Sequence, residues 1–197
     1  MRFFDYYLKE EVTDNFIVIY SGRFQPFHSN HYQCYLDLVR KFDKDKVYIA
    51  TSDKVEPPLN PFSFDEKKRI IVTMFEIPED KIVQVKNPYK PSEVFEKLND
   101  KNVGYISALG KKDSERLSSG DYFVPYGGDK KFYPYTEHGY VYIMPEKQVT
   151  FDGKIITGSL IRKTFTGIDE DKKRRLFDSV YPKFDKDIFD LMINKIR

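Results

Sequence analysis

The sequence feature that most restricts the fold of this chain is a strand–loop–helix unit near its start. In this unit a buried strand is followed by a glycine-containing loop and then by a helix. The apolar run from Phe16 to Tyr20 is typical of a buried strand, and the amphipathic stretch from Tyr32 to Phe42 predicts a helix. The connecting loop contains Gly22 and ends in two histidines, His28 and His31. Unpaired backbone N–H groups at a helix start attract anions, and a spacing of three places both imidazoles on one face. The unit therefore predicts a phosphate-binding site.

Strands and helices continue to alternate along the chain. Further strands are predicted at residues 46–51, 82–85, 103–108 and 140–144. Helices are predicted at residues 63–76 and 91–98, and two more amphipathic helices in 169–197. This alternation favours a parallel sheet with right-handed crossovers. We expect an α/β, Rossmann-like five-stranded parallel sheet flanked by helices, with C-terminal helices, and a ligand site outside the carboxyl ends of the strands.

The loop and the helix start carry a longer motif. The decapeptide Gly22-Arg23-Phe24-Gln25-Pro26-Phe27-His28-Ser29-Asn30-His31 resembles the G-R-F-Q-P-F-H-x-G-H form of the HxGH signature of nucleotidylyltransferases. This form is most similar to nicotinamide mononucleotide (NMN) adenylyltransferases. Asn30 replaces the glycine of that signature, and we expect its side chain to narrow the base or ribose pocket.

Later segments resemble the same enzymes, in the same order. Asn60-Pro61-Phe62-Ser63, followed by Glu66 and Arg69, resembles the N-P-F-T-x-x-E-R segment. Ser63 and Glu66 are spaced to form a capping box. For Arg69, a solvated helix charge and a place in the site both stay open.

Two segments follow predicted strands and resemble nucleotide-contacting segments of the superfamily. After the fourth strand, Leu109 to Arg116 resembles the segment that contacts the nucleotide and offers Gly110, Lys111 and Asp113. After the fifth, Ile156-Thr157-Gly158-Ser159-Leu160-Ile161-Arg162 resembles the second signature, I-S-S-T-x-x-R. Thr157 or Ser159 is predicted to cap a helix there and to leave N–H groups free for phosphate.

The resemblance implies transfer of AMP from ATP to a phosphate acceptor, best NMN, giving NAD and pyrophosphate. It implies His28, His31 and Arg162 as catalytic residues, with Mg²⁺ carried by the nucleotide. The sequence shows no acidic cluster for the metal, so we name no protein metal ligand. The resemblance also implies the remaining nucleotide-binding residues, which are Gly22, Arg23, Phe24, Gly110, Lys111, Asp113, Thr157, Gly158 and Ser159. No pairing of a covalent nucleophile with a base stands out, and phosphoryl-type transfer requires mainly positioning and charge stabilisation.

Alternatives remain for the substrate and for the class of function. Cytidylyl transfer, the acceptors phosphopantetheine and glycerol 3-phosphate, and nucleotide binding without turnover all stay open. The aromatic segment 121–139 offers Tyr122, Phe123 and Tyr126 to the flat ring of an acceptor, and Asn60 is a further candidate. These rings can equally fill a local core or a homo-oligomer interface.

Size and composition set the remaining expectations. The 197 residues suit a single domain, with an N-terminal extension (1–15), a catalytic core (16–165) and C-terminal helices (166–197). A net charge of +2 gives no reason to expect nucleic-acid binding. The chain has one cysteine and neither an apolar run of membrane-spanning length nor a signal-peptide pattern, so we expect a cytoplasmic protein that does not enter membranes.

Overall fold

The computed structural model describes residues 12–117, 121–128 and 130–196. Its strands are β1 (Phe16–Ser21), β2 (Val47–Thr51), β3 (Ile82–Gln84), β4 (Gly104–Leu109), β5 (Phe123–Pro125), β6 (Gly139–Ile143), β7 (Thr150–Phe151) and β8 (Lys154–Ile155). Its helices are α1 (Ser29–Phe42), α2 (Phe64–Phe75), α3 (Ser92–Leu98), α4 (Lys111–Leu117), α5 (Gly158–Phe165), α6 (Glu170–Val180) and α7 (Lys186–Lys195), with a 3₁₀ turn η1 (Glu79–Lys81). Most of the predicted N-terminal extension lies outside the described residues.

The described residues form a parallel six-stranded sheet in the order β3-β2-β1-β4-β6-β5, and β7 and β8 form a separate hairpin. The predicted α/β sheet flanked by helices is confirmed, with one more strand than the five expected. The additional strand, β5, pairs in parallel with β6 at the edge of the sheet. Its three residues end in proline and are too short to show the alternation by which a strand is recognised.

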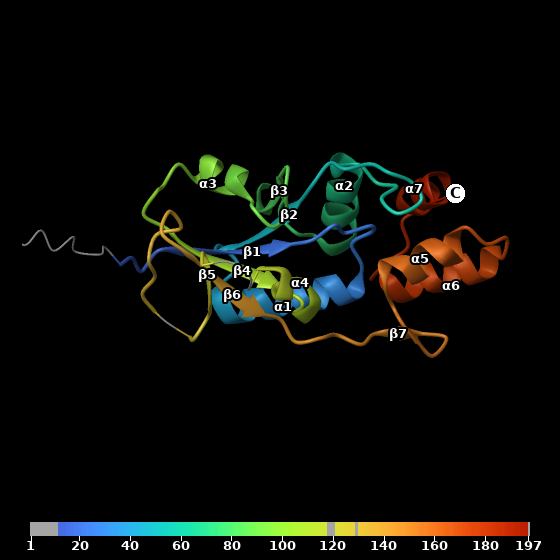
Figure 1. Ribbon diagram of the computed structural model, residues 1–197. Coiled ribbons are helices and arrows are strands. Elements are labelled where there is room, and N and C mark those ends of the chain that lie inside the picture. The colour runs from blue at the N-terminus through green and yellow to red at the C-terminus, as the bar shows by residue number, and fades with distance from the viewer. Residues whose placement is uncertain (1–11, 118–120, 129, 197) are drawn as a thin grey trace, which may run out of the picture.

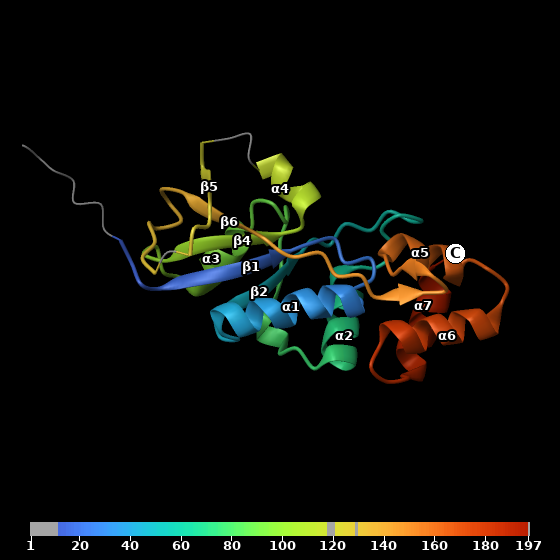
Figure 2. The same ribbon diagram turned by 90° about the horizontal axis from the view of Figure 1, so that it is seen from below.

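Helices cover both faces of the sheet, with α1 and α2 on one face and α3 on the other (Figures 1 and 2). Along β1, Val18 and Tyr20 pack with α1 and α2, whereas Ile17 and Ile19 pack with α3. A strand buried on both faces needs apolar residues at successive positions, which explains the continuous apolar run in the sequence. None of the helices in the described part of the chain has the length and apolar character that crossing a bilayer requires.

The sheet has a point where the strand order reverses. From β1 the chain moves outward through β2 to β3 and then crosses to β4 on the other side of β1. The connections after β1 and β4 therefore leave in opposite directions and open a crevice at their carboxyl ends, the usual ligand position in such sheets. Helices α5, α6 and α7 lie beyond this end of the sheet (Figure 1).

The helix starts follow the predicted local signals. Ser63 and Glu66 form the complete capping box of α2, with the Ser63 hydroxyl accepting from the backbone N–H of Glu66. Thr157 is the N-cap of α5 and accepts from the N–H of Leu160. These caps place the starts of α2 and α5 where the motifs predicted them.

Candidate functional site

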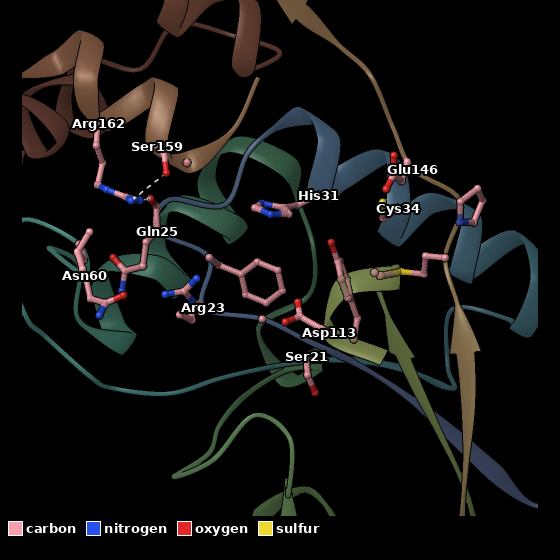
Figure 3. A pocket seen from close by; sticks show the side chains of 18 residues that line it. Ser21, Arg23, Gln25, His31, Cys34, Asn60, Asp113, Glu146, Ser159 and Arg162 are labelled. Atoms are coloured by element: carbon pink, nitrogen blue, oxygen red, sulfur yellow. Dashed lines mark hydrogen bonds between the residues drawn. The ribbon is translucent and has the colours of Figure 1, made fainter. Parts of the chain in front are cut away.

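A cleft of about 350 Å³ opens at the carboxyl ends of β1, β4 and β6 (Figure 3). Its walls come from the loop after β1, the first turns of α1 and α5, the start of α4 and the segment after β6. The predicted nucleotide and catalytic residues that line it are Gly22, Arg23, Phe24, His31, Gly110, Asp113, Gly158, Ser159 and Arg162. Three further predicted residues do not line the cleft: Lys111 and Thr157 are chain neighbours of lining residues, and His28 stacks on His31.

Phe24 shapes the loop after β1. Its backbone is left-handed, with φ 46°, a conformation that costs a non-glycine residue free energy. Its buried ring holds it there, with centroids 5.2 Å from Tyr20, 5.2 Å from Phe27 and 5.0 Å from His31. Gly22 makes room for this ring, because a Cβ at position 22 would lie 2.6 Å from it. The loop conformation thus also sets the edge-on contact that orients the His31 ring.

Gln25 joins this loop to two other segments. Its side-chain amide accepts from the backbone N–H of Phe62 at 2.9 Å and donates to the Phe62 carbonyl at 3.0 Å. Its own carbonyl accepts from the Arg162 guanidinium at 2.5 Å. A Cβ at Gly158 would lie 2.8 Å from the same carbonyl, so glycine is what lets α5 approach the loop this closely.

A fully buried lysine, Lys67 of α2, lies beneath the loop. Its Nζ donates to the Thr51 hydroxyl at 2.9 Å, to the Ser52 carbonyl and to the Arg23 carbonyl at 3.5 Å. Burial lowers the pKa of this amine to about 8. Because the ammonium group satisfies two backbone carbonyls from below, it ties the loop to the carboxyl end of β2.

The geometry also resolves the alternatives for Arg69. This residue is a surface charge, and its guanidinium donates to the exposed Asp187 at 3.3 Å. The N-P-F-T-x-x-E-R segment places its basic residue directly after the glutamate. Here that position is Lys67, and the spacing alone was enough to identify it.

His28 and His31 stack on each other at the start of α1, with ring centroids 3.9 Å apart. His28 is the N-cap and is 3% exposed, whereas His31 lies in the first turn and lines the cleft. Each Nδ1 is buried and lacks a hydrogen-bond partner in the described part of the chain. Burial lowers the pKa of His31 to about 3, and burial and the His31 charge lower the pKa of His28. Both rings are neutral at neutral pH, and an anion in the cleft would favour their protonation.

Two guanidinium groups, those of Arg23 and Arg162, reach the same part of the cleft (Figure 3). Burial lowers the pKa of Arg162, and repulsion from Arg23 lowers it further. Within the described residues neither group forms an ion pair with a carboxylate; Arg162 donates to the Gln25 carbonyl and to the Ser159 hydroxyl. Two such cations beside the open N–H groups of a helix start form a site for a highly charged anion.

Gly110 and Asp113 contribute from the carboxyl end of β4. A Cβ at Gly110 would meet nothing within 4 Å, so the backbone there is open to a ligand. The Asp113 carboxylate accepts from the Tyr89 hydroxyl at 2.9 Å. The side chain of Lys111 is exposed.

Asn30 does not enter the cleft, so the expectation that it narrows the base or ribose pocket is wrong. Its side chain is 8% exposed and turns away from the cleft toward the β7–β8 hairpin. The Nδ2 donates to the Ile156 carbonyl at 2.7 Å, and the Oδ1 accepts from the Val149 N–H at 3.0 Å. These partners lie far along the chain, and nothing in the local sequence indicated them.

The predicted acceptor residues lie in different places. Asn60 lines the main cleft and a smaller adjoining pocket of about 290 Å³. Tyr122 and Phe123 line a separate, wider cleft of about 980 Å³ on the α3 face. The other aromatic residues of this wider cleft are Tyr89, Phe95, Tyr105 and Tyr135. Tyr126 is not among them, because it packs on the α1 face, 5.5 Å from the Phe42 ring.

Comparison with known proteins adds two findings, although no protein-family model matches the chain. A stretch of 52 residues, 26% of this chain, is 40% identical to a nicotinamide-nucleotide adenylyltransferase from Methanolobus tindarius. The match spans 30% of that enzyme's length. The nicotinic acid mononucleotide adenylyltransferase of Plasmodium falciparum, solved with APC, superimposes with a TM-score of 0.53 at 16% identity. That alignment covers 92% of this chain and 94% of the other.

The chain shares its fold with the Plasmodium enzyme. The superposition spans nearly the whole of both chains. Both named proteins agree with the resemblance drawn from the motifs.

Proposed function

We propose that this protein transfers AMP from ATP to a phosphate-bearing acceptor, best NMN, with release of pyrophosphate. The observation that carries the proposal is the convergence of Arg23, Arg162 and His31 on one cleft, beside the first turn of α5. Neither guanidinium has a carboxylate partner among the described residues, so the cleft supplies positive charge that a triphosphate would neutralise.

Each group has a role in this reaction. An oxygen of the acceptor phosphate attacks the α-phosphorus, a new P–O bond forms, and the bond to the β-phosphate oxygen breaks as pyrophosphate leaves. Arg162, Ser159 and the N–H groups beside them hold the β- and γ-phosphates. His31 donates to the charge that develops in the transition state, and His28 supports its ring by stacking. The backbone near Arg23 and Phe24 holds the α-phosphate or the acceptor phosphate.

Mg²⁺ fits this cleft as a partner of the nucleotide. Two carboxylates, those of Asp113 and Glu146, line the cleft, and nowhere among the described residues do three or more acidic, histidine or cysteine side chains gather as a metal site. Mg²⁺ usually keeps several waters and binds substrate phosphates with few protein ligands. We therefore assign the metal to the phosphate oxygens and name no protein ligand.

The competing function is nucleotide binding without turnover. Asn30 was the one departure from the first signature that favoured it. Its side chain leaves the cleft free, so it gives no steric reason for lost activity. Both histidines and Arg162 are present, and we retain catalysis as the proposed function.

For the acceptor, we propose a path from the main cleft toward the aromatic one. The small pocket shares Gly22, Arg23 and Asn60 with the main cleft and shares Tyr89 with the wide aromatic cleft. A mononucleotide that keeps its phosphate near Arg23 can extend its ring along this path. Aromatic faces attract a cationic ring by roughly 0.5–2 kcal/mol, which favours NMN over ringless phosphates.

Turnover should therefore require a nucleotide acceptor with a flat ring. We expect pyrophosphate release from ATP with NMN to exceed release with phosphopantetheine or glycerol 3-phosphate, and ATP to be used in preference to CTP. The measurement is a competition among these acceptors, with nicotinic acid mononucleotide included, against a blank without acceptor. A preference for a ringless acceptor would overturn the NMN assignment, and no release with any acceptor would favour the binding function.

Removing a ring from the aromatic cleft should weaken acceptor binding. For Tyr122→Leu we expect KM for NMN to rise about 2- to 30-fold while KM for ATP is unchanged. Tyr126→Leu is the matched control, because that ring comes from the same segment but packs on the other face of the sheet. Equal effects of the two substitutions on KM would indicate that these rings only fill a core.

A further inference from the structure

The two segments assigned to the phosphates are far apart in the chain. Arg162 joins them at the cleft through the Gln25 carbonyl, and a buried side chain joins them behind it. The first segment runs from Gly22 to His31, and the second begins at Thr157. Asn30 lies between them, with its carboxamide hydrogen-bonded to the Ile156 carbonyl at 2.7 Å and to the Val149 N–H at 3.0 Å. The joined residues are direct chain neighbours of site residues: Asn30 precedes His31, and Ile156 precedes the N-cap of α5.

The same contacts close the base of the β7–β8 hairpin. The N–H of Ile156 donates to the carbonyl of Val149 at 2.8 Å. This leaves the Val149 N–H and the Ile156 carbonyl, and Asn30 hydrogen-bonds to both. Within the hairpin, β7 pairs with β8 in antiparallel orientation, and Thr150 lies opposite Ile155. The segment leading into α5 is thus attached to the start of α1 through the carboxamide of a buried residue.

We propose that Asn30 is a positioning residue that holds the first turn of α5 at a set distance from His31. This inference rests on the proposed function, because it assumes that α5 holds the β- and γ-phosphates while His31 stabilises the reacting phosphorus. Small displacements of such groups reduce transition-state stabilisation strongly, so a bond that fixes their separation contributes to turnover without touching the substrate.

The chemistry at this position requires an amide. Glycine, which the first signature has here, would leave the Val149 N–H and the Ile156 carbonyl without this partner, at the cost of buried unsatisfied groups. Aspartate has nearly the same shape but cannot donate to a carbonyl. Replacing Asn30 with the glycine of the signature should therefore lower the activity of this protein.

The test combines kinetics with amide hydrogen exchange on the full chain. For Asn30→Ala, which loses both hydrogen bonds, and for Asn30→Asp, which loses the bond to the Ile156 carbonyl and sets a carboxylate oxygen against it, we expect kcat/KM for ATP to fall about tenfold. The KM for the acceptor should be unchanged. For Asn30→Gly, kcat/KM for ATP should fall by at least the same factor. Exchange in residues 149–159 should become about tenfold faster, while exchange in α2 stays as in the wild type.

Asp169→Ala is the matched control. It removes a side-chain acceptor from a backbone N–H at the start of α6, outside the cleft, with a comparable loss of stability. We expect it to lower the melting temperature without changing kcat/KM or exchange in residues 149–159.

Three outcomes are decisive. Wild-type kcat/KM in Asn30→Ala and Asn30→Asp would overturn the positioning role, and improved use of ATP by Asn30→Gly would restore the steric interpretation. Unchanged exchange in residues 149–159 would show that Asn30 does not hold this segment. The exchange measurement needs no turnover, so it decides on the attachment even if the wild type proves inactive and the proposed function fails.

Discussion

Replacing His31 with alanine is expected to lower kcat about 100- to 1000-fold, the usual loss when a transition-state donor is removed. His31 is the histidine that lines the cleft, and its ring is held by Phe24 and by the stacked His28. Affinity for ATP should fall much less than kcat, because the contact strengthens as charge develops on the phosphorus. The measurement is steady-state kinetics with ATP and NMN.

The chain contains a suitable control for this substitution. His138 packs against Tyr133 and Tyr140, with centroids 5.0 Å and 4.9 Å away, and does not line the cleft. His138→Ala should keep wild-type kcat. His28→Ala should have a smaller effect than His31→Ala, since His28 stands behind the reacting ring. Full activity in His31→Ala would place the reaction elsewhere.

Acid is expected to destabilise the fold through the histidine pair. Burial lowers the pKa of His31 to about 3 from an ordinary value of 6.5. Between these values the unfolded chain binds a proton that the folded chain does not, so the free energy of unfolding decreases as the pH falls. From pH 6.5 to about pH 4.5 the loss from His31 alone is about 2 kcal/mol, and His28 adds to it in the same direction.

Urea denaturation at several pH values checks this expectation. Carboxylates titrate in the same range, so the comparison is between the wild type and His31→Gln, which keeps a neutral polar side chain but cannot take up the proton. The variant should lose less stability than the wild type as the pH falls. Parallel curves for the two proteins would contradict a neutral, buried His31. Bound ATP should reduce the acid sensitivity, because its negative charge favours the protonated ring.

Local patterns predicted what local interactions determine. The strand and helix on either side of the Gly22 loop, the capping box at Ser63 and the N-cap at Thr157 each depend on residues within a few positions of one another. The placement of the site at the carboxyl ends of the strands followed from strand–helix alternation and parallel topology. The local features could be predicted because both partners of each interaction lie within a few residues of each other in the sequence.

The remaining features depend on distant partners. Asn30 was interpreted as a steric intrusion because its partners, Ile156 and Val149, lie 126 and 119 residues further along the chain, beyond the reach of a local motif. The burial of Lys67 depends on the packing of α2 beneath the loop, although the motif spacing pointed to its position. Tyr126 was grouped with Tyr122 because they are close in sequence, yet the sheet edge separates them onto opposite faces.

The short strands at the two edges of the sheet bear on how copies of this chain can associate. β3 and β5 are each three residues long, and β5 ends in Pro125, which has no N–H to offer a further strand. Both edges therefore give little template for adding a strand from another molecule. We therefore expect the folded chain to resist edge-to-edge aggregation. Any homo-oligomer should form through helix or loop surfaces, without adding strands to the sheet.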